Sequence, residues 1–278
     1  MILVLAKILI SPLLLAASTF VVHRWGGLTG GLLLGLPLIS GPASAMLFVQ
    51  YGPRFAENAA YGTILGFVAA GMFCTSYAAV APRRPWWQSL IAGYGTFFAV
   101  AGLLSLVHLS LGWMLALVPV VLISLAFAIR VPDTAREEPL PRKRVLALRM
   151  TLAGLMVLLI TTSARVLGPE IAGFLAPLPV IAAIMATSSH RHGGSDSVHR
   201  LLRGAVLGSW GGVAFFSAII VLSGTVGPAV TYLIATASAV AAGMFALGLQ
   251  SVASSHHLSL RFPRPMPRMS WGLGRHAG

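Results

Sequence analysis

The stretch GGLTGGLLLGLPLISGPASAMLFVQYG, Gly26 to Gly52, is an apolar segment interrupted by Pro37 and by the pair Gly41-Pro42. The same layout recurs 142 positions later, without a gap, in GPEIAGFLAPLPVIAAIMATSSHRHGG (168–194). Gly and Pro set backbone geometry rather than hydrophobicity, so their coincidence indicates an internal repeat. The matched pairs are Gly26 and Gly168, Gly31 and Gly173, Pro37 and Pro179, Gly52 and Gly194, Gly62 and Gly204, and Gly66 and Gly208.

The composition of the chain is that of a membrane protein. Of 278 residues, 57% are hydrophobic and only 9% are charged, and the mean hydropathy is +0.87. So few charged side chains cannot cover the surface of a soluble domain, and we predict an all-α polytopic membrane protein. The net charge of +13 fits Lys and Arg in loops beside an anionic leaflet better than it fits nucleic-acid binding. We therefore expect membrane lipids, and no nucleic acid, as partners.

About nine apolar segments are long enough to cross a bilayer, since a helical span needs roughly 20 residues. Their apolar sequence is continuous, without the two-residue alternation of transmembrane strands. The start, MILVLAK, lacks a basic leader region and a cleavage site, so we predict a retained first helix. The spacing Gly62-x-x-x-Gly66 predicts close helix packing. The predicted spans are 3–22, 27–49, 57–81, 88–108, 111–130, 146–167, 170–189, 201–223 and 228–250.

The basic residues predict the orientation of these spans. With the N-terminus outside and the C-terminus in the cytoplasm, most of the 19 Lys and Arg fall on the cytoplasmic side. The repeat pairs the first four spans with the last four and leaves 111–130 unpaired, so the second unit enters the membrane in the opposite direction. We predict two inverted four-helix repeats, 1–108 and 146–250, joined by a bridging helix and linker, 109–145, and followed by a disordered basic tail, 251–278.

The duplicated proline is the first candidate for a functional role. Pro37 and Pro179 each remove a backbone donor, and the groups they free are tolerated in a membrane only where they are buried or line a wet cavity. Broken helices at matching positions of inverted repeats are typical of alternating-access transporters, with the substrate at their crossing. Ordinary kinked helices are the alternative, and the sequence leaves both open. Gly41 belongs to the same predicted substrate site.

Ionisable residues in or beside the spans are the other candidates. Lys7 and Arg149 are related by the repeat, and Arg165 lies near the outer end of its span. These three residues would attract an anionic substrate, unless their side chains snorkel to the interface. Glu57 and Glu170 open the third and seventh spans, either as charges that favour the helix dipole or as proton-coupling carboxylates.

No motif in the sequence indicates catalysis or a cofactor. The chain contains no Gly-rich phosphate loop, nucleophile elbow, HExxH or CxxC. The histidines of SSHRHGG have only Asp196 nearby as a further ligand, so we predict no metal site. Cys74, the single cysteine, lies in an apolar segment and indicates packing. We therefore predict that the protein is not an enzyme and has no catalytic residue, metal or cofactor.

The second half of the chain resembles a known family. Arg165 to Gly173, the following PLP (177–179) and LLRGAVLG (201–208) are similar to the GlpM family of small four-helix bacterial inner-membrane proteins. The resemblance implies a duplicated unit in the bacterial cytoplasmic membrane and an association with alginate production. The first half departs from this pattern at two matched positions, with Gly35 in place of Pro177 and Arg54 in place of Asp196.

Two functions from different classes fit these features. The first is a transporter or flippase that moves a small anionic metabolite or a phosphate-bearing lipid intermediate by alternating access at helices 2 and 7. The duplicated layout resembles that of drug/metabolite transporters, although those have ten helices in two fives. The second is a non-catalytic scaffold subunit of a cell-envelope polysaccharide or lipid biosynthetic complex, with the two prolines packed against apolar side chains. Its partners would be other envelope-biosynthesis proteins or a second copy of the chain.

Overall fold

The computed structural model describes residues 40–131 and 168–259, and the single positions Pro37, Ala147, Thr151, Leu155 and Val166. For residues 192, 193, 247 and 249–259 it describes the backbone alone. The described part is helical and contains no strand, as the composition predicts. The predicted span 3–22 and most of the predicted spans 27–49 and 146–167 lie outside the described residues. The predicted site residues Lys7, Arg149 and Arg165 lie outside them too.

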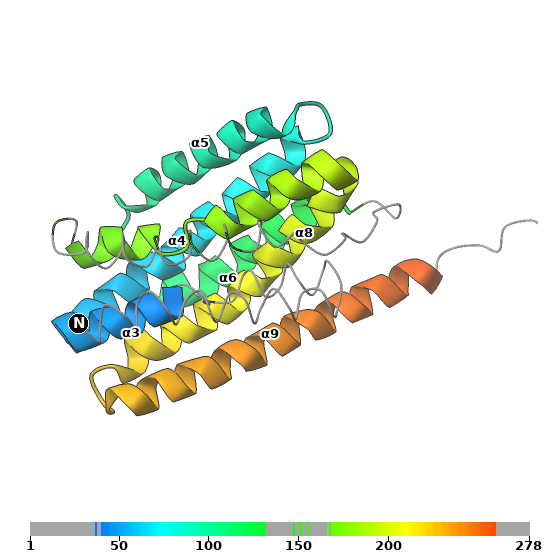
Figure 1. The fold of residues 1–278 in the computed structure, drawn as a ribbon. Helices are drawn as coiled ribbons and strands as arrows, with labels where there is room; N and C mark the ends of the chain where they lie inside the picture. The colour runs from blue at the N-terminus through cyan, green and yellow to red at the C-terminus, as the bar shows by residue number, and fades with distance from the viewer. Residues whose placement is uncertain are drawn as a thin grey trace, which may run out of the picture.

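Long helices lying side by side make up the molecule (Figure 1). A short helical segment, 168–175, precedes α8. At Gly194 α8 breaks, and its second half folds back along its first (Figure 1). The helices are α3 (Ser40–Tyr51), α4 (Pro53–Val80), α5 (Trp86–Leu104), α6 (Leu111–Ala128), α8 (Val180–Leu222) and α9 (Pro228–Ser259).

Six helices in the described part are long and apolar enough to cross a membrane. They coincide with six of the predicted spans, from 57–81 through 228–250, with boundaries that differ by a few residues. The remaining three predicted spans fall wholly or mostly outside the described residues. The membrane-crossing helices are Pro53–Val80, Trp86–Leu104, Leu111–Ala128, Gly168–Arg191, Gly194–Leu222 and Pro228–Ala246.

Helix α4 lies at the centre of the bundle. In its most apolar stretch 67% of residues are buried, against 17% for α5 and 22% each for α6 and α9. The peripheral helices carry large apolar side chains on their outer surfaces, such as Phe98, Trp113 and Leu233. In a bilayer these faces meet lipid tails, so the exposed apolar surface is expected.

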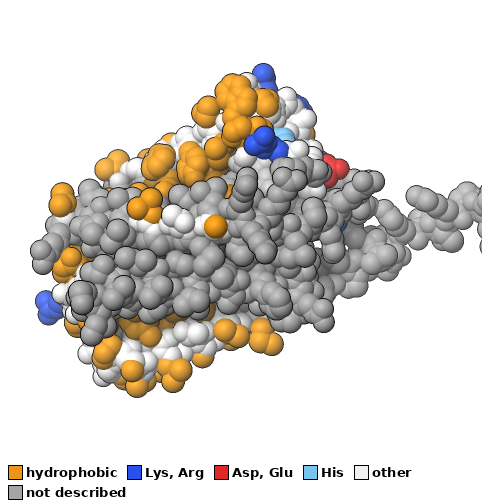
Figure 2. Space-filling model, viewed as in Figure 1, with side chains coloured by type: hydrophobic (Ala, Val, Ile, Leu, Met, Phe, Trp, Pro, Cys, Tyr) orange, Lys and Arg blue, Asp and Glu red, His pale blue; other side chains and the backbone are white. Residues whose placement is uncertain are grey.

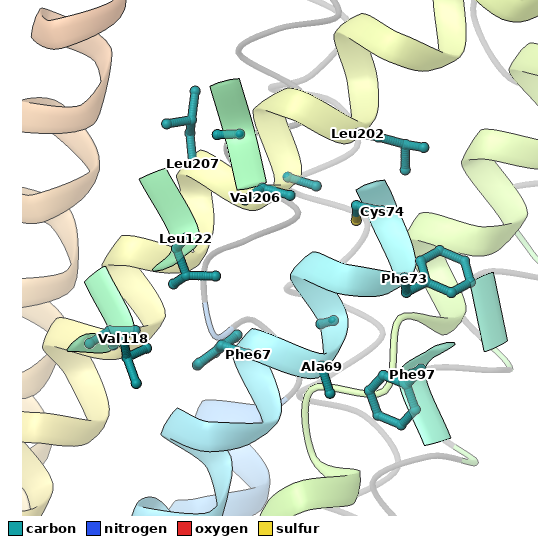
Figure 3. Packing of buried hydrophobic residues seen from close by; sticks show 14 of the residues in the cluster. Phe67, Ala69, Phe73, Cys74, Phe97, Val118, Leu122, Leu202, Val206 and Leu207 are labelled. Atoms are coloured by element: carbon teal, nitrogen blue, oxygen red, sulfur yellow. The ribbon is translucent and has the colours of Figure 1, made fainter. Parts of the chain in front are cut away.

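The core between these helices is apolar and closely packed (Figure 3). It combines Phe67 and Phe73 of α4 with Phe97 of α5, Leu122 of α6 and Leu202 of α8 in one buried cluster. Since lipid tails are as apolar as these side chains, van der Waals packing rather than the hydrophobic effect holds such helices together. Cys74 is buried in this core, which confirms its predicted packing role.

Segment 168–175 crosses α4 with the two backbones in contact. A side chain at Gly62 would run into the carbonyl oxygen of Glu170, and a side chain at Gly173 would run into the carbonyl oxygen of Ala59. At Gly66 an added Cβ would lie 2.6 Å from the Pro177 ring. The structure thus confirms that Gly62 and Gly66 serve close helix packing. This crossing therefore positions the following residues, up to Pro179, beside α4.

Candidate functional site

The chain between segment 168–175 and α8 is not helical. Pro177 and Pro179 have no N–H to donate. The N–H of Val180 donates to the carbonyl of Leu178 at 2.8 Å, and Pro179, with φ −80° and ψ 52°, is the centre of an inverse γ-turn. The predicted span 170–189 is therefore a broken helix.

Helix α8 begins at this break without a side-chain cap. The N–H of Val180 is taken up by the turn, and the two amides after it are the usual unpaired donors of a helix N-terminus. The carbonyl of Pro179 accepts the N–H of Ala183 at 2.8 Å. The start of α8 thus presents backbone donors and the positive end of the helix dipole.

Pro37 occupies the corresponding place before α3. It is half-buried and lies outside the helix. Its carbonyl accepts the N–H of Gly41 at 2.8 Å, the same bond at the same spacing as that from Ala183 to Pro179. The repeat pairs Pro37 with Pro179 and Gly41 with Ala183. Both prolines therefore play the same backbone role.

The matched glycines Gly52 and Gly194 also share one conformation. Gly52 has φ 87° and ψ 178°, and Gly194 has φ 77° and ψ −179°. This region of backbone space is essentially restricted to glycine. Each glycine separates a short helix that follows a proline from a long helix, α4 in one case and the second half of α8 in the other.

The two short helices start in the same layer of the molecule. Pro177, just before the second break, packs on Gly66 in the middle of α4. The neighbouring Phe67 packs against Phe216, with ring centroids 6.1 Å apart. An added Cβ on Gly41 at the start of α3 would lie 3.3 Å from the ring of Phe215. Both proline breaks therefore lie level with the middle of the central helix.

From this layer the two short helices run toward opposite ends of α4. Helix α3 ends at Tyr51, which stacks on Phe55 at the start of α4 with ring centroids 4.6 Å apart. The first half of α8 reaches Ala81 at the other end of α4, where a hydrogen bond joins His190 to the Ala81 backbone. We name these ends the Gly52 end and the Gly194 end.

One tyrosine holds α3 in place near the Gly52 end. The hydroxyls of Ser44 and Tyr232 are 2.8 Å apart, in a hydrogen bond between α3 and α9. The ring of Phe48 meets the ring of Tyr232 edge-on, with centroids 6.0 Å apart and an interplanar angle of 83°. We call this pair of interactions the Tyr232 contact.

A second tyrosine holds the first half of α8 in a similar way. The side chain of Thr187 is hydrogen-bonded to Tyr77 of α4. The ring of His190 meets the Tyr77 ring with centroids 6.0 Å apart at 68°, and its Nδ1 lies 3.4 Å from the Tyr77 hydroxyl. We call this the Tyr77 contact. The repeat pairs His190 with Phe48.

The structure brings only some of the predicted site residues together. Pro37, Gly41 and Pro179 lie at the two breaks, with apolar neighbours. Glu57 is half-exposed in the second turn of α4, near the Gly52 end, whereas Glu170 is exposed and its backbone packs on Gly62, one turn from Gly66. Among the described residues no three His, Cys, Asp or Glu side chains could hold a metal ion.

The sequence analysis missed the four side chains that hold the short helices: Ser44, Tyr77, Thr187 and Tyr232. A signal for two of them was present. Ser44 and Thr187 follow their prolines by seven and eight residues, and the paired rings Phe48 and His190 both follow by eleven. The tyrosines lie on other helices, so only the fold identifies them.

Fold and helix composition together define a multi-pass helical membrane protein. Comparison of the chain with protein-family models, curated proteins and solved structures finds no significant match. The resemblances to the GlpM family and to drug/metabolite transporters therefore stay predictions.

Proposed function

We propose that the protein is a transporter or flippase that works by alternating access in a bacterial cytoplasmic membrane. One observation carries the proposal: two proline breaks start short helices in one central layer and send them to opposite ends of the molecule. Discontinuous helices meeting near the midplane form the substrate sites of many secondary transporters.

The proposed substrate carries a negative charge, as a small anionic metabolite or a phosphate-bearing lipid intermediate. The N-termini of α3 and α8 both lie in the central layer, and no side chain caps the first amides of α8. Such termini favour anions through their backbone donors and dipoles. Lys7, Arg149 and Arg165 are proposed to add positive charge to this site.

The shared geometry of the matched prolines and glycines supports an inverted duplication with nine spans. The described arginines support the orientation, with the Gly194 end in the cytoplasm and the N-terminus outside. Arg54 lies at the Gly52 end, and Glu57 and Glu170 are proposed to couple protons. The arginines toward the Gly194 end are Arg83, Arg84, Arg130, Arg191, Arg200 and Arg203.

Alternation would come from releasing one short helix at a time. The Tyr232 contact closes the Gly52 side and the Tyr77 contact closes the Gly194 side, and both are formed in the structure. Gly52 and Gly194 supply the points at which each short helix turns. We therefore assign the structure to an occluded state.

Uptake into proteoliposomes tests this proposal. Purified protein is reconstituted and supplied with labelled inorganic phosphate, a dicarboxylate, or a fluorescent phosphatidylglycerol, with a labelled cationic amine as reference. We expect uptake or flipping of at least one anionic probe, and its loss in P179A, because alanine restores the amide and favours a continuous helix. Pro119, which lies within α6 and outside both breaks, gives the control P119A. Equal activity in P179A and wild type would contradict the role of the breaks.

A scaffold subunit of an envelope-biosynthesis complex is the second candidate. It is favoured by the apolar packing at both breaks, where Pro177 meets Gly66 and Gly41 meets Phe215. A scaffold predicts no uptake of any probe. It also predicts that P37A and P179A leave envelope polysaccharide and lipid production unchanged.

A further inference from the structure

Three arginines converge where the α4–α5 turn meets the end of the first half of α8. Arg83 and Arg84 lie in that turn, held by hydrogen bonds from both of their N–H groups to the Val80 carbonyl at 3.0 and 3.1 Å. The guanidinium of Arg191 lies over the ring of Trp86, 5.6 Å from its centroid. His190, next to Arg191, is hydrogen-bonded to the backbone of Ala81. Figure 2 shows basic groups gathered in the upper right of the molecule.

Positive charge dominates this end of the molecule, where the structure describes one acid, Asp196. Residues 81–91 contain no Asp or Glu, and in the described part of the chain no ion pair joins the three arginines to a carboxylate. The prolines at 82 and 85 flank Arg83 and Arg84 and stiffen their turn. Like charges held together in a fixed geometry favour an anion between them.

The cluster lies at the boundary of the membrane. The span of α4 ends at Val80, the span of α5 begins at Trp86, and the span before Gly194 ends at Arg191. Phosphate groups of lipids lie at this level, and Trp residues prefer it. All three arginines are exposed, so a ligand can reach them.

An apolar stripe runs down α5 from the cluster into the membrane. Trp87, Ile91 and Phe98 are 48%, 64% and 55% exposed, and their spacing places them on one face of the helix. An acyl chain lying on this stripe would have its headgroup beside Arg84 and Arg191.

We propose that Arg83, Arg84, Arg191 and Trp86 form a binding site for the headgroup of an anionic glycerophospholipid whose acyl chain packs on the α5 stripe. The charge of the cluster selects the headgroup, and the exposed stripe selects a lipid over a soluble phosphate. The site is separate from the proline breaks and does not depend on whether the protein transports.

Native mass spectrometry of the full-length protein in a neutral detergent tests the site. Dioleoyl-phosphatidylglycerol is titrated against dioleoyl-phosphatidylcholine as the zwitterionic reference. We expect preferential binding of phosphatidylglycerol, weakened roughly fivefold in R191Q and further in the double variant R83Q/R84Q, because each arginine near an anionic surface contributes about that factor. The control R54Q, at the opposite end, keeps the wild-type affinity. R83Q/R84Q carries the test if R191Q does not fold, since its side chains lie in an exposed turn.

Two further measurements distinguish a lipid headgroup from a soluble phosphate as the ligand. Dihexanoyl-phosphatidylglycerol, whose chains are too short to follow the stripe, is expected to bind more weakly, and I91S is expected to weaken only the long-chain lipid. Inorganic phosphate that binds wild type as tightly as the long-chain lipid would overturn the lipid assignment. Equal binding of the two headgroups, or equal losses in R54Q and R191Q, would overturn the site.

Discussion

At the scale of single residues, the glycines of α4 have an unusually direct role. Gly62 leaves room for the backbone carbonyl of Glu170, so its missing side chain sets the distance between two helices. A carbonyl cannot move away as a flexible side chain can, so any larger residue must separate the helices.

We predict that G62A lowers the stability of the protein despite the better helix propensity of alanine. Overpacking costs about 1–3 kcal/mol, whereas Gly to Ala in a helix gains about 1 kcal/mol. Thermal unfolding in detergent measures the net effect. G95A is the matched control, because an added Cβ at Gly95 meets nothing within 4 Å. A G62A melting temperature at or above that of G95A would contradict the packing account.

The hydroxyls of the two tyrosines give a second prediction at this scale. Y232F removes the bond to Ser44 and should favour opening at the Gly52 end, whereas Y77F removes the bonds to His190 and Thr187 and should favour opening at the Gly194 end. A hydrogen bond contributes about 0.5–1.5 kcal/mol net, which corresponds to a shift of roughly two- to tenfold. Labelling by impermeant maleimides added from each side measures the shift.

Y94F is the control for this pair, since no hydrogen bond of the Tyr94 hydroxyl is seen in the described part of the structure. Shifts of the same sign in Y77F and Y232F, or a shift in Y94F as large as theirs, would show that the tyrosine contacts do not act as opposing closures.

At the scale of elements, each short helix is joined to a long helix by one glycine. Gly52 and Gly194 both adopt a conformation that other residues reach only at a cost of about 1–3 kcal/mol. Neither would meet a neighbour if a Cβ were added, so the cost of substitution is purely conformational.

We therefore predict similar destabilisation in G52A and G194A, within about a kcal/mol of each other. Thermal or denaturant unfolding of the two variants checks this expectation. G112A, in open space within α6 and without positive φ, should not lose stability. If G52A were neutral while G194A was strongly destabilised, the two turns would not be equivalent.

How far the sequence predicts these elements depends on the residue type. Pro and Gly act on their own backbone, so the repeat alone indicated Pro37, Pro179, Gly52 and Gly194 as positions that set the backbone geometry. The continuous apolar runs likewise located the six described spans. The tyrosine contacts could not be predicted, because Tyr77 and Tyr232 touch residues more than a hundred positions away. Glu57 shows the converse: its charge suggested a site, yet the fold leaves it near one end of α4.

At the scale of the whole molecule, the basic residues are distributed unevenly along the axis of α4, the axis along which the two short helices diverge. The proline breaks lie midway along α4, Glu57 lies near the Gly52 end, and most described arginines, with Asp196, lie toward the Gly194 end. In the proposed mechanism, release of one short helix at a time exposes the centre to one side or the other without changing the long helices. This property is the central claim of the proposed function.

Two-sided cysteine accessibility at the short helices tests that claim most directly. In a background without the native thiol (C74A), single cysteines replace Ala45 of α3 and Ile184 of α8, both half-buried. The account predicts that a transported anion changes the two labelling rates in opposite directions, with Ala45 labelled from the Gly52 end and Ile184 from the Gly194 end. Labelling of neither position from any side, with or without anions, would contradict alternating access and leave the scaffold.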